Sequence, residues 1–136
     1  MMDERAFSFR MSEEQSSMKE TLARLMKGRV VGNPAHEMDE QRAIPLELLN
    51  QVWELGTVVS SVPEAYGGYG MEYSPILNTI VLEELAAGDM ALALAACLPA
   101  AFIYTVLEMG TEEQKKKYLP PYCSSAYKAC TVAINE

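Results

Sequence analysis

One cluster of side chains in the 136-residue sequence has the right chemistry to hold a metal ion. His36 lies beside three carboxylates, Glu37, Asp39 and Glu40, and imidazole and carboxylate groups are common ligands of divalent cations. Their spacing, however, matches none of the known metal-ligand motifs. An exposed acidic turn is therefore the better interpretation, and we predict no metal site here.

The other candidates for catalysis also lack partners. No base is apparent for the serines that could act as nucleophiles, namely Ser60, Ser61, Ser124 and Ser125. Glu83 and Glu84 are adjacent on a predicted helix and point about 100° apart, which favours a solvated edge over an acid–base pair. The glycines at 67, 68 and 70 lack the strand–loop–helix context of a phosphate site. The sequence therefore predicts no catalytic residue of its own.

The composition is typical of one soluble globular domain. Apolar residues make up 49% of the sequence and charged residues 22%, and the formal net charge is −8. Such an acidic protein gains no counterion-release attraction to nucleic acid, and an anionic membrane would repel it. Three cysteines without C-x-x-C spacing favour a reducing compartment. No signal peptide is expected, because charged residues at 3–5 precede any apolar run.

The longest uncharged segment, residues 90–107, tests this soluble interpretation. Its 18 residues are the lower limit for a membrane span. Alanine, which contributes little transfer energy, is frequent in it, and Pro99 lies in its middle. The flanking Asp89 and Glu108 show no positive bias. We therefore predict a central helix, or two helices with a break at Pro99, surrounded by other helices, and no membrane span.

Local signals place the remaining helices. An apolar stripe at helical spacing predicts a first helix, formed by Met11, Met18, Leu22 and Leu25. Glycines and a proline between 28 and 34 weaken or end that helix, and residues 36–42 are expected to form a surface connection or a short helical turn.

Capping residues define the later elements. A second helix begins at Pro45 and ends near Gly56, which suits a left-handed C-cap. Residues 58–62 are then expected to be extended. Ser74 with Pro75 opens a third helix, and Asp89 caps the apolar helix that follows. A short helix begins with the capping box formed by Thr111 and Gln114.

Only the end of the sequence changes its period. Residues 130–135 alternate between apolar and polar side chains, which is a strand pattern. A single strand has no convincing partner in this chain. The chain is therefore expected to end where a sheet begins.

Three segments in this order resemble the acyl-CoA dehydrogenase family. Residues 62–70, VPEAYGGYG, are similar to the family's P-E-x-x-G-G-x-G loop, and a helix containing LEELA at 82–86 follows as it does there. An alanine-rich helix comes next. Residues 110–120, GTEEQKKKYLP, resemble the family's G-T-x-E-Q-K-x-x-Y-L-P segment, which is the most specific of the matches.

The resemblance implies the fold class and the domain organisation. It implies an all-α, orthogonal helical bundle of the acyl-CoA dehydrogenase N-terminal domain type over residues 1–127. One C-terminal β-strand, the first strand of a truncated middle β domain, is expected at 128–136. The catalytic carboxylate of most family members lies in a C-terminal domain. The isolated 136-residue chain is therefore expected to be inactive and to bind FAD weakly or not at all.

The resemblance also implies where ligands bind. In this family the helical domain forms one wall of the acyl pocket and covers part of the flavin. The substrate-binding residues on the matching helix share one face at i, i+3, i+4 and i+7, and are Leu98, Ala101, Phe102 and Thr105. Periodicity alone does not distinguish this wall from plain core. The flavin contacts are expected at Val132, Ile134 and Asn135, where Asn135 stands in place of the family's threonine.

The whole protein is accordingly expected to be an FAD-dependent acyl-CoA dehydrogenase of fatty acid metabolism, which removes an α-proton and transfers the β-hydrogen to the flavin. The implied partners are an acyl-CoA substrate, an electron-transfer flavoprotein or another acceptor, and further copies in a homo-oligomer. The implied location is the cytoplasm, or the mitochondrial matrix in a eukaryote. Two alternatives stay open: an acyl-CoA oxidase or flavin monooxygenase on the same fold, and a helical interaction module without enzymatic activity.

Overall fold

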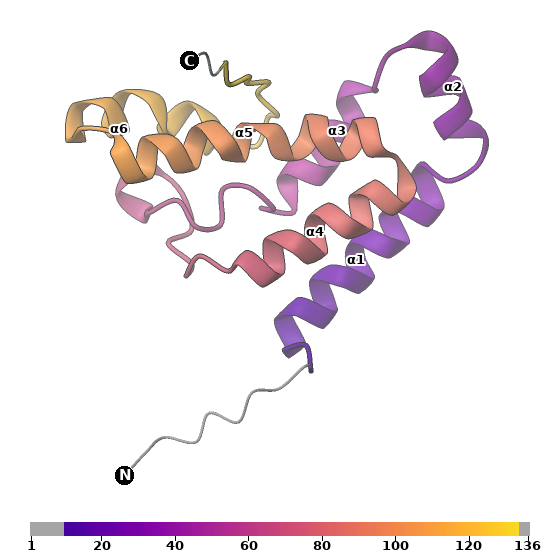
Figure 1. The fold of residues 1–136 in the computed structure, drawn as a ribbon, viewed down its shortest axis with the longest axis horizontal. Helices are drawn as coiled ribbons and strands as arrows, with labels where there is room; N and C mark the ends of the chain where they lie inside the picture. The colour runs from indigo at the N-terminus through magenta and orange to yellow at the C-terminus, as the bar shows by residue number, and fades with distance from the viewer. Residues whose placement is uncertain (1–9, 134–136) are drawn as a thin grey trace.

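The computed structural model describes residues 10–133, which form helices and loops (Figure 1). The helices are α1 (Glu13–Arg29), α2 (Asn33–Gln41), α3 (Leu46–Glu54), α4 (Pro75–Gly88), α5 (Met90–Met109) and α6 (Glu112–Tyr118), with the short 3₁₀ helices η1 (Glu64–Tyr66) and η2 (Pro120–Tyr122). Helices α1 and α4 lie side by side, and α5 packs against α3, α4 and α6. The predicted all-α fold class is confirmed.

The helices begin where side chains satisfy the free N–H groups of the first turn. Ser74 and Asp89 accept hydrogen bonds from the backbone of the helices that they precede, α4 and α5. The capping box of Thr111 and Gln114 opens α6 as predicted. Ser12 and Gln15 form a second capping box at the start of α1. That box was missed, although its S-x-x-Q spacing is visible in the sequence.

Helix α1 ends at Arg29, within the stretch 28–34 that was predicted to weaken or end it. Of the two alternatives for residues 36–42, the helical one is confirmed, because most of them lie in α2, in whose first turn the missing N–H of Pro34 is not needed. One local prediction was wrong. Residues 58–62 are not extended. They form hydrogen-bonded turns after Gly56, which has a φ of +72° as predicted. Burial of Val58, Val59 and Val62 in the core accounts for this compact path.

The buried side chains form two adjoining clusters. The first lies between α1, α3, α4 and the first half of α5, and Leu22, Leu85 and Leu92 are fully buried in it. The second lies under the second half of α5 and contains Trp53 and Ile103. Tyr127 packs against both clusters, so the segment after η2 is part of the helical body.

Helix α5 is continuous through Pro99, which is buried. A proline inside a helix removes the hydrogen bond to the carbonyl four residues earlier, here Ala95. The hydroxyl of Tyr127 donates to that carbonyl oxygen at 2.9 Å and replaces the missing donor. By length and composition alone, α5 could cross a membrane, and 33% of its most apolar window is buried. A core helix meets the same test, so this is weak evidence for a span.

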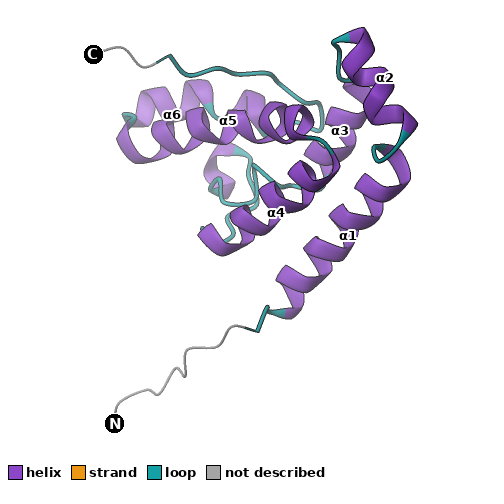
Figure 2. Ribbon diagram, turned by 45° about the vertical axis from the view of Figure 1, so that its right-hand side comes forward, coloured by secondary structure: helices purple, strands orange, loops and turns teal. Residues whose placement is uncertain are grey.

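The end of the chain leaves the helical body as an extended segment. Residues 128–133 run beside α5 and α6 without strand hydrogen bonds (Figure 2). The strand expected at 128–136 thus has no counterpart in its described part, and residues 134–136 lie outside the described residues. The strand stays a prediction.

Candidate functional site

Apolar and small side chains form an exposed stripe along α5. Leu94, Leu98, Ala101, Thr105 and Met109 recur at spacings of three and four residues and therefore share one side of the helix. Leu94 is 57% exposed, Leu98 43% and Met109 84%, and Ala101 and Thr105 are also exposed. We refer to these five residues as the α5 stripe.

Three of the four predicted substrate residues lie on the α5 stripe. Because Leu98, Ala101 and Thr105 are exposed, they do not belong to the core of this domain. The hydroxyl of Thr105 donates to the carbonyl of Ala101 at 2.7 Å, so its polar group is satisfied within the helix. The stripe can therefore cover an apolar ligand without leaving a buried hydroxyl unpaired.

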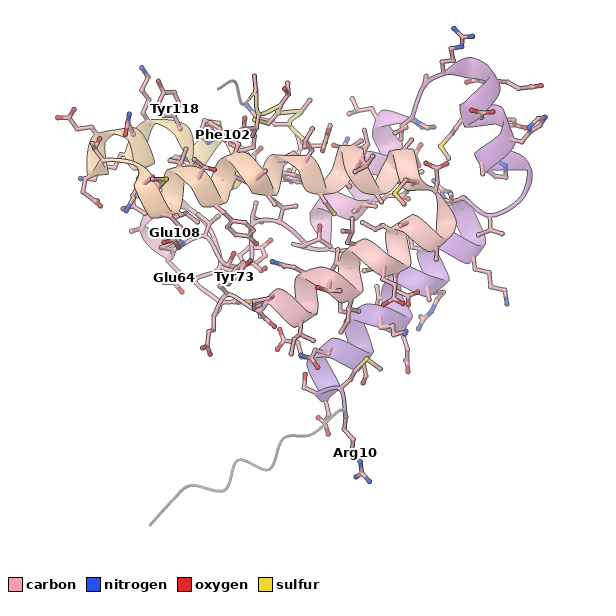
Figure 3. The ribbon with its side chains drawn as sticks, in the orientation of Figure 1. Arg10, Glu64, Tyr73, Phe102, Glu108 and Tyr118 are labelled. Atoms are coloured by element: carbon pink, nitrogen blue, oxygen red, sulfur yellow. The ribbon has the colours of Figure 1, made fainter. Side chains whose placement is uncertain are left out.

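Phe102, the fourth predicted residue, is half-buried and turned toward α6. Its ring lies 5.5 Å from the ring of Tyr122 and 6.3 Å, nearly perpendicular, from that of Tyr118 (Figure 3). Phe102, Thr105 and Met109 line a hollow of about 300 Å³ between α5 and α6. The structure thus places Phe102 at the edge of the α5 stripe and not on it.

Burial raises the pKa of several thiol and phenol groups around α5, which therefore stay neutral near pH 7. Burial raises the pKa of the Cys97 thiol to about 11. Burial, with a hydrogen bond to Cys130, raises the pKa of Tyr122 to about 12. Burial also raises the pKa of Tyr127. Near neutral pH these groups favour binding of an apolar group and not proton transfer.

Of the predicted flavin contacts, only Val132 lies among the described residues. Its side chain is 41% exposed, and neither its N–H nor its carbonyl has a hydrogen-bond partner within residues 10–133. Ile134 and Asn135 lie outside the described residues. Leu94 and Met109 were missed as members of the α5 stripe, although continuing the helical spacing from Leu98 and Thr105 would have found both.

The acidic cluster on α2 remains a surface feature. The Nε2 atom of His36 lies 3.4 Å from an Oε1 atom of Glu40, one turn along the helix, and both side chains are exposed. Among the described residues, no group of three histidine, cysteine, aspartate or glutamate side chains is placed to hold a metal ion.

Fold and site together define an all-α domain that presents one uncovered, mostly apolar helix face. The family model described as "Acyl-CoA dehydrogenase, N-terminal domain" matches residues 12–126. The chain therefore belongs to the acyl-CoA dehydrogenase family.

Relatives with this name cover most of the chain. It is 36% identical over 115 residues to a probable medium-chain specific acyl-CoA dehydrogenase of Caenorhabditis briggsae, covering 85% of the chain and 28% of the relative. A solved glutaryl-coenzyme A dehydrogenase complex with glutaryl-CoA has a TM-score of 0.76 at 30% identity, covering 86% of this chain and 30% of that one. The chain thus spans less than a third of the length of these relatives.

One solved relative holds a flavin. An acyl-CoA dehydrogenase of Bacillus anthracis complexed with FAD has a TM-score of 0.61 at 26% identity, covering 85% of this chain and 19% of that one. Flavin binding is therefore a property of the family to which this chain belongs.

Proposed function

We propose that this chain is the N-terminal domain of an FAD-dependent acyl-CoA dehydrogenase and that the α5 stripe forms one wall of its acyl pocket. The observation that carries the proposal is the exposure of Leu98, Ala101 and Thr105 on one side of a helix whose opposite side is packed in the core. Phe102 would close the wall toward α6. An apolar acyl chain would cover this surface and gain the free energy of apolar burial.

The chain contributes walls and positioning to this reaction and leaves the chemistry to other groups. FAD, when bound, accepts the hydride from the substrate. The peptide groups of Val132, which have no hydrogen-bond partner within residues 10–133, fit a contact with the flavin through the backbone. We propose that Ile134 and Asn135 continue this contact. The neutral side chains around the α5 stripe suit a thioester tail and not a catalytic base.

The domain boundary at 127/128 is supported by the contacts of the segment before it. Trp53 Nε1 donates to the carbonyl of Ser124 at 3.0 Å, and the backbone N–H of Tyr127 donates to Asn50 Oδ1 at 2.8 Å. The chain leaves the helical body after Tyr127. We propose residues 1–127 as the helical domain and 128–136 as the start of a middle β domain.

The proposal for the whole protein includes its partners. They are an acyl-CoA thioester, an electron-transfer flavoprotein or another acceptor, and further copies in a homo-oligomer. Such a protein would act in the cytoplasm or, in a eukaryote, in the mitochondrial matrix. By itself the 136-residue chain should be inactive and should bind FAD weakly or not at all. A stable yellow complex with stoichiometric flavin, formed by this chain alone, would contradict that expectation.

The test begins with the native gene beyond codon 136. We expect proline and a glycine-rich stretch there, followed later by a helix that carries a carboxylate. A stop codon directly after Glu136 would reject the enzyme and favour an interaction module.

The acyl-pocket wall is tested in the protein encoded by that whole gene. Leu98→Trp should shift the preference for acyl-CoA substrates toward shorter chains, because the larger ring occupies the pocket. Leu82→Trp is the matched control, since Leu82 lies on α4 and is 42% exposed against 43% for Leu98. An unchanged chain-length profile in Leu98→Trp, with FAD bound normally, would reject the wall.

A further inference from the structure

A second hollow lies on the flank of α5 that adjoins the α5 stripe, since Glu108 on its rim follows Thr105 by three residues. It has a volume of about 240 Å³ and is lined by Ser61, Tyr73, Tyr104, Leu107 and Glu108. Tyr104, Leu107 and Glu108 are three and four residues apart and come from one side of α5. Tyr73 comes from the loop before α4 and lies on the same side of α5 as Glu108 (Figure 3).

Two aromatic rings form perpendicular walls of this hollow. The ring centroids of Tyr73 and Tyr104 are 5.0 Å apart, with an interplanar angle of 80°. Tyr104 is fixed, because its hydroxyl oxygen accepts hydrogen bonds from Ser61 Oγ at 3.3 Å and Asn78 Nδ2 at 3.2 Å. Tyr73 is 54% exposed and makes the outer wall. The inner wall is thus held rigidly before any ligand arrives.

The charge of the hollow is negative. Glu108 is an exposed carboxylate on its rim, and among the described residues no lysine or arginine lines it. Within residues 10–133, Glu108 forms no ion pair. A carboxylate beside an aromatic face is an arrangement that attracts alkylated ammonium ions, through charge and through the negative face of the ring.

We propose that Tyr73, Tyr104 and Glu108 form a binding site for an alkylated ammonium group. The cation would lie in the hollow against an open ring face of the Tyr73–Tyr104 pair, with Glu108 compensating its charge and Leu107 contacting its methyl groups. A volume of about 240 Å³ has room for roughly eight waters at about 30 Å³ each, and so for a trimethylammonium head. The ligand could be a small choline-like molecule or a methylated lysine side chain, which share this chemistry. None of the residues that line the hollow belongs to the α5 stripe.

The test uses the 136-residue chain and choline chloride, followed by NMR chemical shifts at constant ionic strength. We expect saturable shifts that include the rings of Tyr73 and Tyr104. The neutral carbon isostere of choline, with a tert-butyl group in place of trimethylammonium, should bind at least fivefold more weakly. Absence of saturable shifts, or equal binding of the isostere, would overturn the proposal.

Variants separate the ring and charge contributions. Tyr73→Leu and Glu108→Gln should each weaken choline binding roughly two- to fivefold, the range of one exposed cation–π contact. Tyr69→Leu is the control, because Tyr69 is 58% exposed and does not line the hollow, and its affinity should stay within about twofold of the wild type. Unchanged binding in both Tyr73→Leu and Glu108→Gln, with wild-type circular dichroism, would refute the site.

A peptide that carries trimethyllysine distinguishes the two sources of the cation. Binding at least tenfold tighter than choline would assign the site to a protein segment, and similar affinity would assign it to a small ligand. Binding of the unmodified lysine peptide as tight as that of the methylated one would contradict the assignment to an alkylated cation.

Discussion

The hydrogen bond from Tyr127 to Ala95 can be tested by removing one oxygen atom. Tyr127→Phe keeps the ring and its perpendicular contact with Trp53, whose centroid is 5.6 Å away. It removes the donor that lies 2.9 Å from the carbonyl oxygen of Ala95, whose helical donor is absent because residue 99 is proline. An acceptor left unsatisfied costs about 1–3 kcal/mol when fully buried. Because this bond is only partly buried, we expect a loss near the lower limit, about 1 kcal/mol.

The free energy of unfolding is measured by urea denaturation, with circular dichroism and the fluorescence of Trp53 as probes. The two probes should agree and the m-value should be unchanged. Tyr118→Phe is the matched control, since Tyr118 is 41% exposed and its hydroxyl has no hydrogen-bond partner within residues 10–133. That variant should change stability by less than about 0.5 kcal/mol.

A double-mutant cycle with Pro99→Ala isolates the physical cause. Alanine at position 99 supplies the N–H that α5 lacks, so the carbonyl of Ala95 regains a helical donor. In that background, Tyr127→Phe should cost about 0.5 kcal/mol or less, which gives a coupling of about 0.5 kcal/mol or more between the two sites. If Tyr127→Phe costs the same in both backgrounds, Tyr127 does not replace the donor missing at Pro99.

Three further predictions concern the helix N-cap Asp89, the carboxylate of Glu112 and the thiol of Cys97. Asp89→Ala should lower the free energy of unfolding, measured by urea denaturation, by about 1 kcal/mol, because it removes the N-cap of α5. Asp89→Asn should keep most of the wild-type stability, because asparagine can also cap a helix. The hydroxyl of Tyr66 donates a hydrogen bond to Glu112 at 2.9 Å and lowers the pKa of that carboxyl group. The hydrogen bond therefore stabilises the fold above the ordinary carboxyl pKa, and this stabilisation is lost as the pH falls through the lowered pKa. Tyr66→Phe should raise the pKa of Glu112 in a carboxyl NMR titration, and an unchanged value would contradict this. Burial raises the pKa of the Cys97 thiol to about 11. Iodoacetamide at about pH 8 should therefore alkylate Cys97 far more slowly in the folded chain than in the chain unfolded by urea. Equal rates would show that Cys97 is not buried.

Local signals in the sequence predicted most helix ends correctly. Asp89, Thr111 and Gln114 act within three or four residues, so their effect does not depend on the rest of the fold. The sequence left residues 36–42 open between a connection and a helical turn, because a proline such as Pro34 can both end one helix and begin another, and only the arrangement of the neighbouring helices selects between them. Val58 and Val59 were assigned to an extended segment because valine favours strands. That assignment failed because burial of both side chains in a compact turn outweighs this weak propensity.

The sequence by itself determined the family, the helical class and the common face of Leu98, Ala101 and Thr105, because these depend on motif order and on a period of 3.6 residues. Only the tertiary structure decided that this face is uncovered, since periodicity shows which residues share a side of α5 but not which side its neighbours occupy. Only the tertiary structure likewise shows that Tyr73 and Glu108, 35 residues apart in the sequence, lie close together. They line one hollow because the packing of α4 against α5 brings the loop before α4 to the second half of α5.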